Sequence, residues 1–339
     1  MRFACDTGGT FTDLVVEDHN EIRLFKTSTT PDDPVRGVLN ALSVAAAHYG
    51  QERIDFLRRA EMFIHGTTRA INAILTGNTA TTAFITTEGH PDILVIREGG
   101  RIEPFNFRVP YPEPYVPKRY SFTVPERIDA QGRIVTPLDE DAVMKVIDRL
   151  RHLKVEAIGV CFLWSIVNGA HEKRVGELLA RHLPGVPVTL SHILNPTLRE
   201  YRRASSTVID ASLKPLMFDY LNGLTTRLRE AGFAGRTLMV TSQGGVMDVE
   251  AVACAPIHSI NSGPSMAPVA GTFYAERDFG QAVAIVADTG GTSYDVSLVR
   301  DGRIPWTRET WLGQRFRGHM TGFPSVDVKS IGAGGGSVA

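Results

Sequence analysis

The stretch DTGGTFTD, residues 6–13, holds two adjacent glycines between two short apolar runs. Residues 288–295 read DTGGTSYD and match that stretch at six of eight positions. Strand-like sequence flanks both copies, so each is predicted to be a β-hairpin with a tight turn. A supersecondary unit that recurs at this distance predicts a chain of two halves that begin alike.

The remaining pattern predicts an α/β protein with domains at 1–198 and 199–339. Its first part is expected to run β-β-β-α-β-α-β. The strands expected before residue 200 cover 2–6, 11–18, 21–29, 61–68, 81–89, 157–164 and 187–190. The helices expected there cover 35–48, 69–77, 140–153 and 170–182. Residues 99–137 are dense in proline and glycine and are expected to form a surface excursion with little regular structure.

In the second half, a long helical stretch is expected over 191–232, broken near Lys214-Pro215 because proline lacks a backbone N–H. A strand at 237–245 and a helix at 261–277 precede the second hairpin. After that hairpin, the Asp301-Gly302 turn predicts a third strand. The chain stops in the glycine-rich SIGAGGGSVA, so the second domain is expected to be completed by a further segment or another polypeptide.

Composition excludes several classes of partner. The 339 residues are 43% apolar and 22% charged, with a formal net charge of −1, which gives no reason to expect nucleic acid or an anionic membrane as a ligand. No apolar run approaches the ~20 residues of a membrane helix, and the N-terminus lacks signal-peptide anatomy. Cys5, Cys161 and Cys254 lie far apart without metal-ligand spacing and are expected to be buried, reduced thiols of a cytoplasmic protein.

The doubled hairpin favours phosphate binding. A Gly-Gly turn lets backbone N–H groups approach a ligand, and neighbouring threonine hydroxyls suit phosphate oxygens. An aspartate beside such a turn would repel a phosphate that carries no metal, so we expect the aspartate to bind Mg²⁺. If the hairpin sequence occurred once, an ordinary turn without a ligand would remain an alternative. Its occurrence twice favours two hairpins that bind one triphosphate from opposite sides. The GxxxxGK[ST], GxSxG and HExxH motifs of other enzyme classes are absent.

Six segments together resemble the hydantoinase/oxoprolinase family, in its ATP-binding A-type subunit. They are DTGGTFTD, HGTTRAINAILTG (65–77), SQGG (242–245), NSGP (261–264), DTGGTSYD and SIGAGGGS (330–337). The resemblance covers essentially the whole chain and implies the actin-like ATPase fold of sugar kinases and heat-shock chaperones, in which two domains each open with a phosphate-binding hairpin. Chains of this family run on well beyond the last segment.

The resemblance also assigns site residues. Asp6 and Asp288 would organise Mg²⁺ or Mn²⁺ around bound ATP, and His65 would have a catalytic role in the cleft, with a hydrogen-bonded loop histidine as the alternative. The remaining nucleotide-binding positions would be Thr7, Gly8, Gly9, Thr10, Thr12, Asp13, Thr289, Gly290, Gly291, Thr292, Asp295, Gly334 and Gly335.

The activity that the resemblance implies is ATP-dependent activation of a carbonyl or enol oxygen by phosphoryl transfer, with bicarbonate also activated in the members that carboxylate a ketone. The outcome is carboxylation of a ketone or opening of a cyclic amide, with a B-type subunit as partner in a hetero-oligomer. The stretch IREGGRIEPFNF (96–107) looks more like the ketone-carboxylase branch. A small-molecule kinase active without a partner, and a chaperone-like or cytoskeletal ATPase, are the alternatives.

Overall fold

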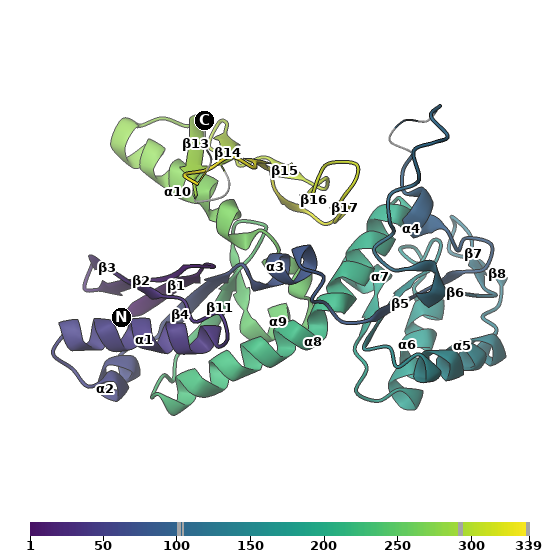
Figure 1. The fold of residues 1–339 in the computed structure, drawn as a ribbon, viewed down its shortest axis with the longest axis horizontal. Coiled ribbons are helices and arrows are strands. Elements are labelled where there is room, and N and C mark those ends of the chain that lie inside the picture. Colours follow the sequence, from purple (N-terminus) through teal and green to yellow (C-terminus); the bar gives the residue numbers. More distant parts are fainter. Residues whose placement is uncertain (100–102, 104, 291–293, 337–339) are drawn as a thin grey trace. The chain divides into compact units, whose positions relative to one another are not determined.

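The computed structural model of the chain describes residues 1–99, 103, 105–290 and 294–336. The chain divides into two compact units, shown as a ribbon in Figure 1. Unit 1 comprises Met1–Asn72, Met217–Thr307 and Pro324–Ala339. Unit 2 comprises Ala73–Leu216 and Arg308–Phe323. Among the described residues, no helix combines the length and hydropathy needed to cross a bilayer.

Unit 1 is built on a six-stranded sheet in the order β12-β11-β4-β1-β2-β3. Its strands are β1 (Arg2–Thr7), β2 (Phe11–Asp18), β3 (Glu21–Ser28), β4 (Met62–Thr67), β11 (Arg236–Val240) and β12 (Val246–Asp248). β1 pairs with β2 in antiparallel and with β4 in parallel register. The first hairpin is therefore held on both sides of β1 by backbone hydrogen bonds.

The helices of unit 1 lie between its strands in the chain. They are α1 (Pro34–His48), α2 (Arg53–Arg58), α3 (Arg69–Leu75), α9 (Val249–Cys254), the 3-10 turn η2 (Pro256–Ser259) and α10 (Ser262–Phe279). Asp33 caps α1 by accepting a hydrogen bond from the Arg36 N–H, and Pro34 occupies the first turn, where its missing N–H costs nothing. The apolar face of α1, with Val38 and Leu42, is buried.

The second hairpin is also in unit 1, as β13 (Ala284–Thr289) and β14 (Tyr294–Val299). β14 is flanked on its other side by β19 (Val328–Ile331), and β15 (Trp306–Thr307) pairs with β18 (Ser325–Val326). The two hairpins share one register: Asp6 faces Asp13 in the first, and Asp288 faces Asp295 in the second. The sequence repeat is thus also a repeat of backbone pairing.

Unit 2 contains a parallel four-stranded sheet in the order β10-β9-β5-β6. Its strands are β5 (Thr82–Thr87), β6 (Ser121–Val124), β9 (Ala157–Cys161) and β10 (Val188–Leu190). One face is covered by α5 (Glu140–His152) and α6 (Ala170–His182), and the other by α4 (Ile93–Ile96) and the start of α8 (Glu200–Glu230). Shorter elements are η1 (Lys118–Tyr120), β7 (Arg127–Ile128), β8 (Ile134–Thr136), α7 (Ser191–Leu194), β16 (Trp311–Leu312) and β17 (His319–Met320).

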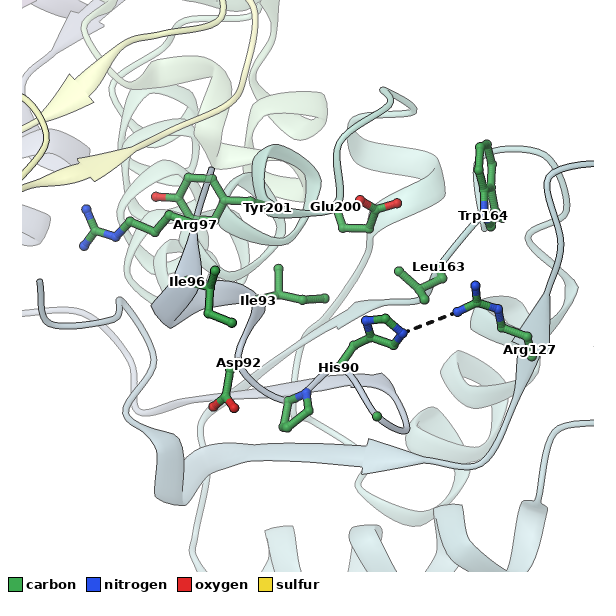
Figure 2. A pocket seen from close by; sticks show the side chains of 12 residues that line it. His90, Asp92, Ile93, Ile96, Arg97, Arg127, Leu163, Trp164, Glu200 and Tyr201 are labelled. Atoms are coloured by element: carbon green, nitrogen blue, oxygen red, sulfur yellow. Dashed lines mark hydrogen bonds between the residues drawn. The ribbon is translucent and has the colours of Figure 1, made fainter. Parts of the chain in front are cut away.

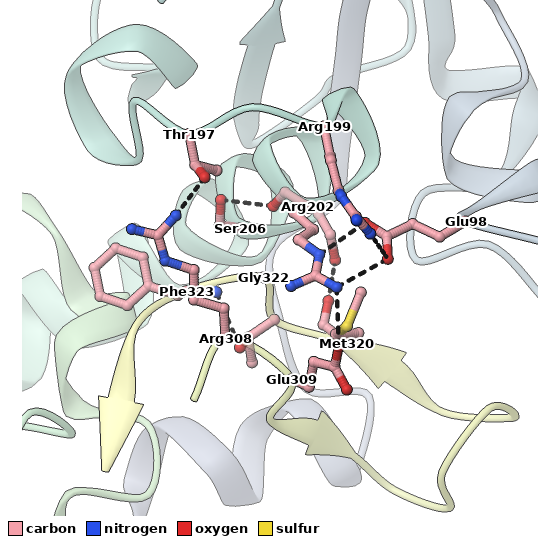
Figure 3. A network of polar contacts seen from close by, with 12 residues as sticks. Glu98, Thr197, Arg199, Arg202, Ser206, Arg308, Glu309, Met320, Gly322 and Phe323 are labelled. Atoms are coloured by element: carbon pink, nitrogen blue, oxygen red, sulfur yellow. Dashed lines mark hydrogen bonds and ion pairs between the residues drawn. The ribbon is translucent and has the colours of Figure 1, made fainter. Parts of the chain in front are cut away.

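The segment 308–323 is tied to the start of α8 by a polar network (Figure 3). Arg202 donates to Glu98 at 2.7 Å and to Glu309 at 3.0 Å, and the Ser205 hydroxyl donates to the Met320 carbonyl. Gly322 lies so close to α8 that an added Cβ would be 2.4 Å from the Arg202 carbonyl oxygen. A side chain at this position would therefore separate the segment from the helix.

Three expectations from the sequence are wrong in detail. α8 continues through Pro215, because fully buried Leu213 and Met217 hold the helix on either side of the missing hydrogen bond. The proline-rich 99–137 region contains β6, which the parallel neighbour β5 holds in the sheet. After the Asp301-Gly302 turn the chain forms an Arg300–Arg303 bridge and then β15, but β15 pairs with β18 and does not extend the second hairpin, whose free edge at β14 is taken by β19.

The cysteines also differ from expectation. Cys5 and Cys161 are buried as predicted, whereas Cys254, the last residue of α9, is exposed.

Candidate functional site

The first hairpin turns tightly at its glycines. The Gly8 N–H donates to the Phe11 carbonyl at 3.0 Å, and this leaves Gly9 and Thr10 exposed at the tip. A Cβ added to Gly9 would meet nothing within 4 Å. The backbone at the tip is therefore open to a ligand, as the sequence predicted for a phosphate-binding turn.

Two carboxylates stand opposite each other at the base of this turn. Asp6 and Asp13 are direct partners across the strands, a placement that costs free energy for like charges. Asp13 also forms a solvent-exposed ion pair with Lys26, at 3.0 Å. Asp6 is exposed on its outer side, yet desolvation of the carboxylate where it faces the sheet, and then the negative charge of Asp13, raise the pKa of Asp6. A cation beside Asp6 would relieve both effects.

Gly66 makes room for Asp6, and sequence reasoning did not single it out. The parallel pairing of β1 with β4 places Gly66 beside Asp6, and a Cβ on Gly66 would lie 2.7 Å from the Asp6 Oδ1 atom. Only glycine leaves the carboxylate in its present position. The signal was available in the HGTT segment, where this glycine follows His65.

His65 is fully buried and both of its ring nitrogens are engaged. Nδ1 lies 3.1 Å from the Cys5 carbonyl oxygen, and Nε2 lies 2.7 Å from the Tyr220 hydroxyl. Burial lowers the pKa of His65 to about 4. In this arrangement His65 holds β1, β4 and α8 together, and the geometry favours the hydrogen-bonded alternative over the predicted catalytic role.

The threonines of the first hairpin divide into two groups. Thr10 is exposed at the tip, whereas Thr7 and Thr12 are buried. The Thr12 hydroxyl shares a 3.0 Å hydrogen bond with that of Thr29, which in turn donates to the Gly8 carbonyl at 3.0 Å. Thr12 therefore braces the turn from inside, and Thr10 is the threonine placed to meet a ligand.

In the second hairpin, Asp288, Thr289 and Gly290 are exposed. The Gly335 N–H donates to the Gly290 carbonyl at 3.0 Å, so the glycine-rich loop that includes Gly334 reaches this turn. The predicted positions Gly291 and Thr292 lie outside the described residues. Asp295 is the cross-strand partner of Asp288.

The carboxylates of the two hairpins fit Mg²⁺ better than they fit a zinc-type metal. No group of three or more His, Cys, Asp or Glu side chains able to hold a metal occurs in the described part of the chain. A zinc-type site needs such a group, whereas Mg²⁺ keeps several waters and binds through one or two carboxylates plus phosphates. Asp6 and Asp288 are the single carboxylates that fit this second kind of binding.

The sequence of the chain was compared with protein families and with individual known proteins. Residues 2–183 match the family model of the hydantoinase/oxoprolinase N-terminal region, and residues 203–339 match that of hydantoinase/oxoprolinase. The chain is 34% identical, over its whole length, to caprolactamase subunit alpha of Pseudomonas jessenii, of which it covers 48%. It is 33% identical, over 98% of its length, to acetophenone carboxylase gamma subunit of Aromatoleum aromaticum, of which it covers 47%.

Among solved structures, the ATP-dependent caprolactamase from Pseudomonas jessenii superimposes with a TM-score of 0.87 at 33% identity, over 98% of this chain and 48% of that one. The chain belongs to the hydantoinase/oxoprolinase family, and it spans about half the length of the curated relatives it matches. The predicted fold class is confirmed: the mixed α/β architecture with parallel strands agrees with an actin-like ATPase fold.

Replacing Gly66 by alanine tests the position of Asp6. The new Cβ would force the Asp6 carboxylate to rotate away, because their present separation is 2.7 Å. We expect affinity for Mg²⁺·ATP, measured by calorimetry, to fall about tenfold or more, while the free energy of unfolding changes by less than about 1 kcal/mol. Gly223→Ala in α8, where a Cβ meets nothing within 4 Å, is the matched control. If Gly66→Ala binds Mg²⁺·ATP as tightly as the wild type, the present position of the Asp6 carboxylate is not needed for nucleotide binding.

The buried His65 predicts a pH-dependent stability. The unfolded chain takes up a proton at this residue below about pH 6.5, and the folded chain does so only below about 4. The free energy of unfolding should therefore fall as the pH drops from 6.5 to 4, by on the order of 3 kcal/mol from this group. Urea unfolding at several pH values should show a shallower pH dependence in His65→Gln than in the wild type. The exposed His19→Gln is the control, and identical slopes in all three proteins would contradict the assignment.

Proposed function

We propose that this chain is the ATP-binding part of an enzyme that activates a carbonyl or enol oxygen by phosphoryl transfer. The observation that carries the proposal is the doubled hairpin, with an aspartate pair in the same register in both copies. Membership of the hydantoinase/oxoprolinase family, and similarity to an ATP-dependent caprolactamase, support the choice of nucleotide.

Each part of the hairpins would have a separate task. The open backbone at Gly9 and Thr10 would donate N–H groups to phosphate oxygens, while the Gly8 N–H, which donates to the Phe11 carbonyl, closes the turn. The exposed turn at Thr289 and Gly290 would donate in the same way in the second hairpin. Asp6 and Asp288 would hold the Mg²⁺ that accompanies the nucleotide. The exposed ion pair of Lys26 with Asp13 lowers the negative charge that the first turn presents to the phosphates.

Bound Mg²⁺·ATP would supply the γ-phosphoryl group: its bond to the β-phosphate oxygen breaks as a bond to the substrate oxygen forms, and ADP leaves. The chain's own contribution is positioning and electrostatic stabilisation. The relatives include a caprolactamase and an acetophenone carboxylase at nearly equal identity. The proposal therefore includes two reactions: opening of a cyclic amide and carboxylation of a ketone.

The two-sided grip on the nucleotide is tested with Asp6→Ala and Asp288→Ala. Groups that act as a unit fail together, so each single variant should lower ATP turnover about a hundredfold or more, and the double variant should be no worse. Turnover is measured as ADP release by the chain together with its partner subunit, and Mg²⁺·ATP binding by the chain alone. Asp219→Ala, at an exposed position of α8, is the control. Near-wild-type turnover in either single variant would contradict the hypothesis that both hairpins bind one nucleotide.

We further propose that coupled turnover requires a B-type subunit. Caprolactamase subunit alpha and acetophenone carboxylase gamma subunit are each named as one subunit of an enzyme. A phosphorylated enol or amide is lost to water unless it forms in a closed site or passes to a partner. The isolated chain should therefore give little or no product, and adding the partner should restore product and ADP in step. Full conversion by the chain without a partner would instead favour a small-molecule kinase or a self-sufficient enzyme.

A further inference from the structure

A cavity of about 420 Å³ lies in unit 2, past the carboxyl ends of three neighbouring parallel strands. His90 follows β5, Arg127 follows β6, and Trp164 follows β9 (Figure 2). Within the described residues, the Arg127 guanidinium contacts only the His90 ring, at 3.5 Å. None of the Arg127 nitrogens is buried without a partner, so water can satisfy them and nothing there requires a ligand.

Arg69 occupies the corresponding place in unit 1, but its guanidinium is less well satisfied. It follows β4 and is the first residue of α3. Its Nε atom is buried without a hydrogen-bond partner, and no described carboxylate forms an ion pair with the side chain. The two terminal Nη nitrogens also lack an acceptor among the described residues, but they are not buried. A cation that is partly desolvated and unpaired gains free energy when an anion binds to it.

Tyr220 of α8 holds the Arg69 side chain in place. The guanidinium carbon lies 5.1 Å from the centre of the Tyr220 ring, which is a cation–π contact. The Tyr220 hydroxyl is 2.7 Å from Nε2 of the buried His65, and Tyr220 is itself buried. At its backbone, the Arg69 N–H donates to the Thr67 hydroxyl oxygen at 3.2 Å. The guanidinium is therefore oriented before any ligand binds.

The parallel pairing of β1 with β4 brings Arg69 beside the first hairpin. Thr67, the last residue of β4, pairs with Thr7, the last residue of β1, and the exposed Gly9 is two residues further along. Neighbouring strands lie about 4.8 Å apart and two residues span at most about 7 Å, so the Cα atoms of Arg69 and Thr7 are within about 12 Å of each other. An arginine side chain spans much of that distance, so its guanidinium comes within reach of a phosphate group held at the turn.

The charges at the first hairpin call for a further cation when nucleotide binds. Asp6 and Asp13 face each other there, and Lys26 is already paired with Asp13. Mg²⁺·ATP keeps a net negative charge, and phosphoryl transfer spreads charge over the oxygens of the transferred group, so such sites combine the metal with an arginine or a lysine. Among the described residues at the carboxyl ends of β1 and β4, Arg69 is the cation without an acidic partner.

The side from which Arg69 approaches selects one phosphate. In the sheet order β11-β4-β1-β2, β4 lies on the side of β1 away from β2. The strands β1, β4 and β11 are parallel, and sheets of this kind bind ligands past the carboxyl ends of their strands. An acceptor molecule bound there meets the last phosphate of the nucleotide. A cation on the β4 side therefore lies at the phosphoryl group that is transferred.

We propose that Arg69 binds the γ-phosphate of ATP held at the first hairpin. Its Nη N–H groups donate to the γ-phosphate oxygens, whose spacing the planar guanidinium fork matches. The bond from the γ-phosphorus to the β-phosphate oxygen breaks as the bond to the acceptor oxygen forms, and Arg69 stabilises the negative charge on the group in transit. This inference rests on the proposed function, because it needs nucleotide at the first hairpin, and it adds a side chain to that site.

The test compares two nucleotides by calorimetry on the chain, each with Mg²⁺: ADP, and the β,γ-imido analogue of ATP, which resists hydrolysis. Arg69→Gln should weaken binding of the imido analogue about tenfold or more and binding of ADP less than about twofold, because ADP has no γ-phosphate. Arg69→Lys keeps the charge but not the fork, so its affinity for the imido analogue should lie between those of Arg69→Gln and the wild type.

Arg58→Gln is the matched control, because it removes one positive charge from an exposed position of α2 in the same unit, and it should bind both nucleotides like the wild type. Circular dichroism verifies that each variant is folded. If Arg69 only packs on Tyr220, Arg69→Gln lowers the free energy of unfolding and leaves the ratio of the two affinities unchanged. That result, or an equal loss for both nucleotides, would overturn the inference and leave ATP binding at the hairpins standing. If the wild type binds neither nucleotide, the proposed function fails and this inference fails with it.

Discussion

The parallel pairing of β1 with β4 controls the chemistry of the first hairpin. It places Gly66, which has no side chain, against the one carboxylate at the turn that lacks a salt-bridge partner among the described residues. The antiparallel pairing with β2 then places Asp13 on the other side of Asp6. Folding therefore creates a concentrated negative charge that the sheet compensates only in part. Sites of this kind reduce the stability of the free protein and regain that free energy when a cation binds.

The two hairpins share a register but have different surroundings. β1 is paired along both edges, and Phe3 and Cys5 are buried. β13 pairs only with β14 in the described part of the chain, and Ile285 is 77% exposed. The same strand register therefore occurs in a buried and in an exposed setting.

Local features of the fold were predictable from sequence. The hairpins, α1, α5 and α6 follow from turn residues and apolar periodicity, which act over a few neighbouring positions. Features that depend on distant parts of the chain were not. The burial of His65 depends on Tyr220 of α8, and the position of Asp6 depends on Gly66 in another strand. Pro215 is tolerated because of tertiary packing, and β6 forms because β5 is beside it.

In the candidate site, too, local features could be predicted from the sequence and features that depend on distant residues could not. Sequence located the tip of the first turn but could not separate the exposed Thr10 from Thr12, whose hydroxyl points inward to Thr29. The cavity of unit 2 was not foreseen, since its residues come from loops after three strands and from the start of α8. Nothing in their spacing along the chain brings them together; the order of the strands in the sheet does.

The exposed position of Cys254 has a practical consequence. Burial raises the pKa of the Cys161 thiol to about 11 and that of Cys5 further still, so neither forms the reactive thiolate near neutral pH. Cys254 is the only thiol of the three that solvent reaches. A maleimide dye would therefore attach at the end of α9 in unit 1 without any cysteine first being removed. A second dye on a cysteine introduced into unit 2 would then report the distance between the units by energy transfer.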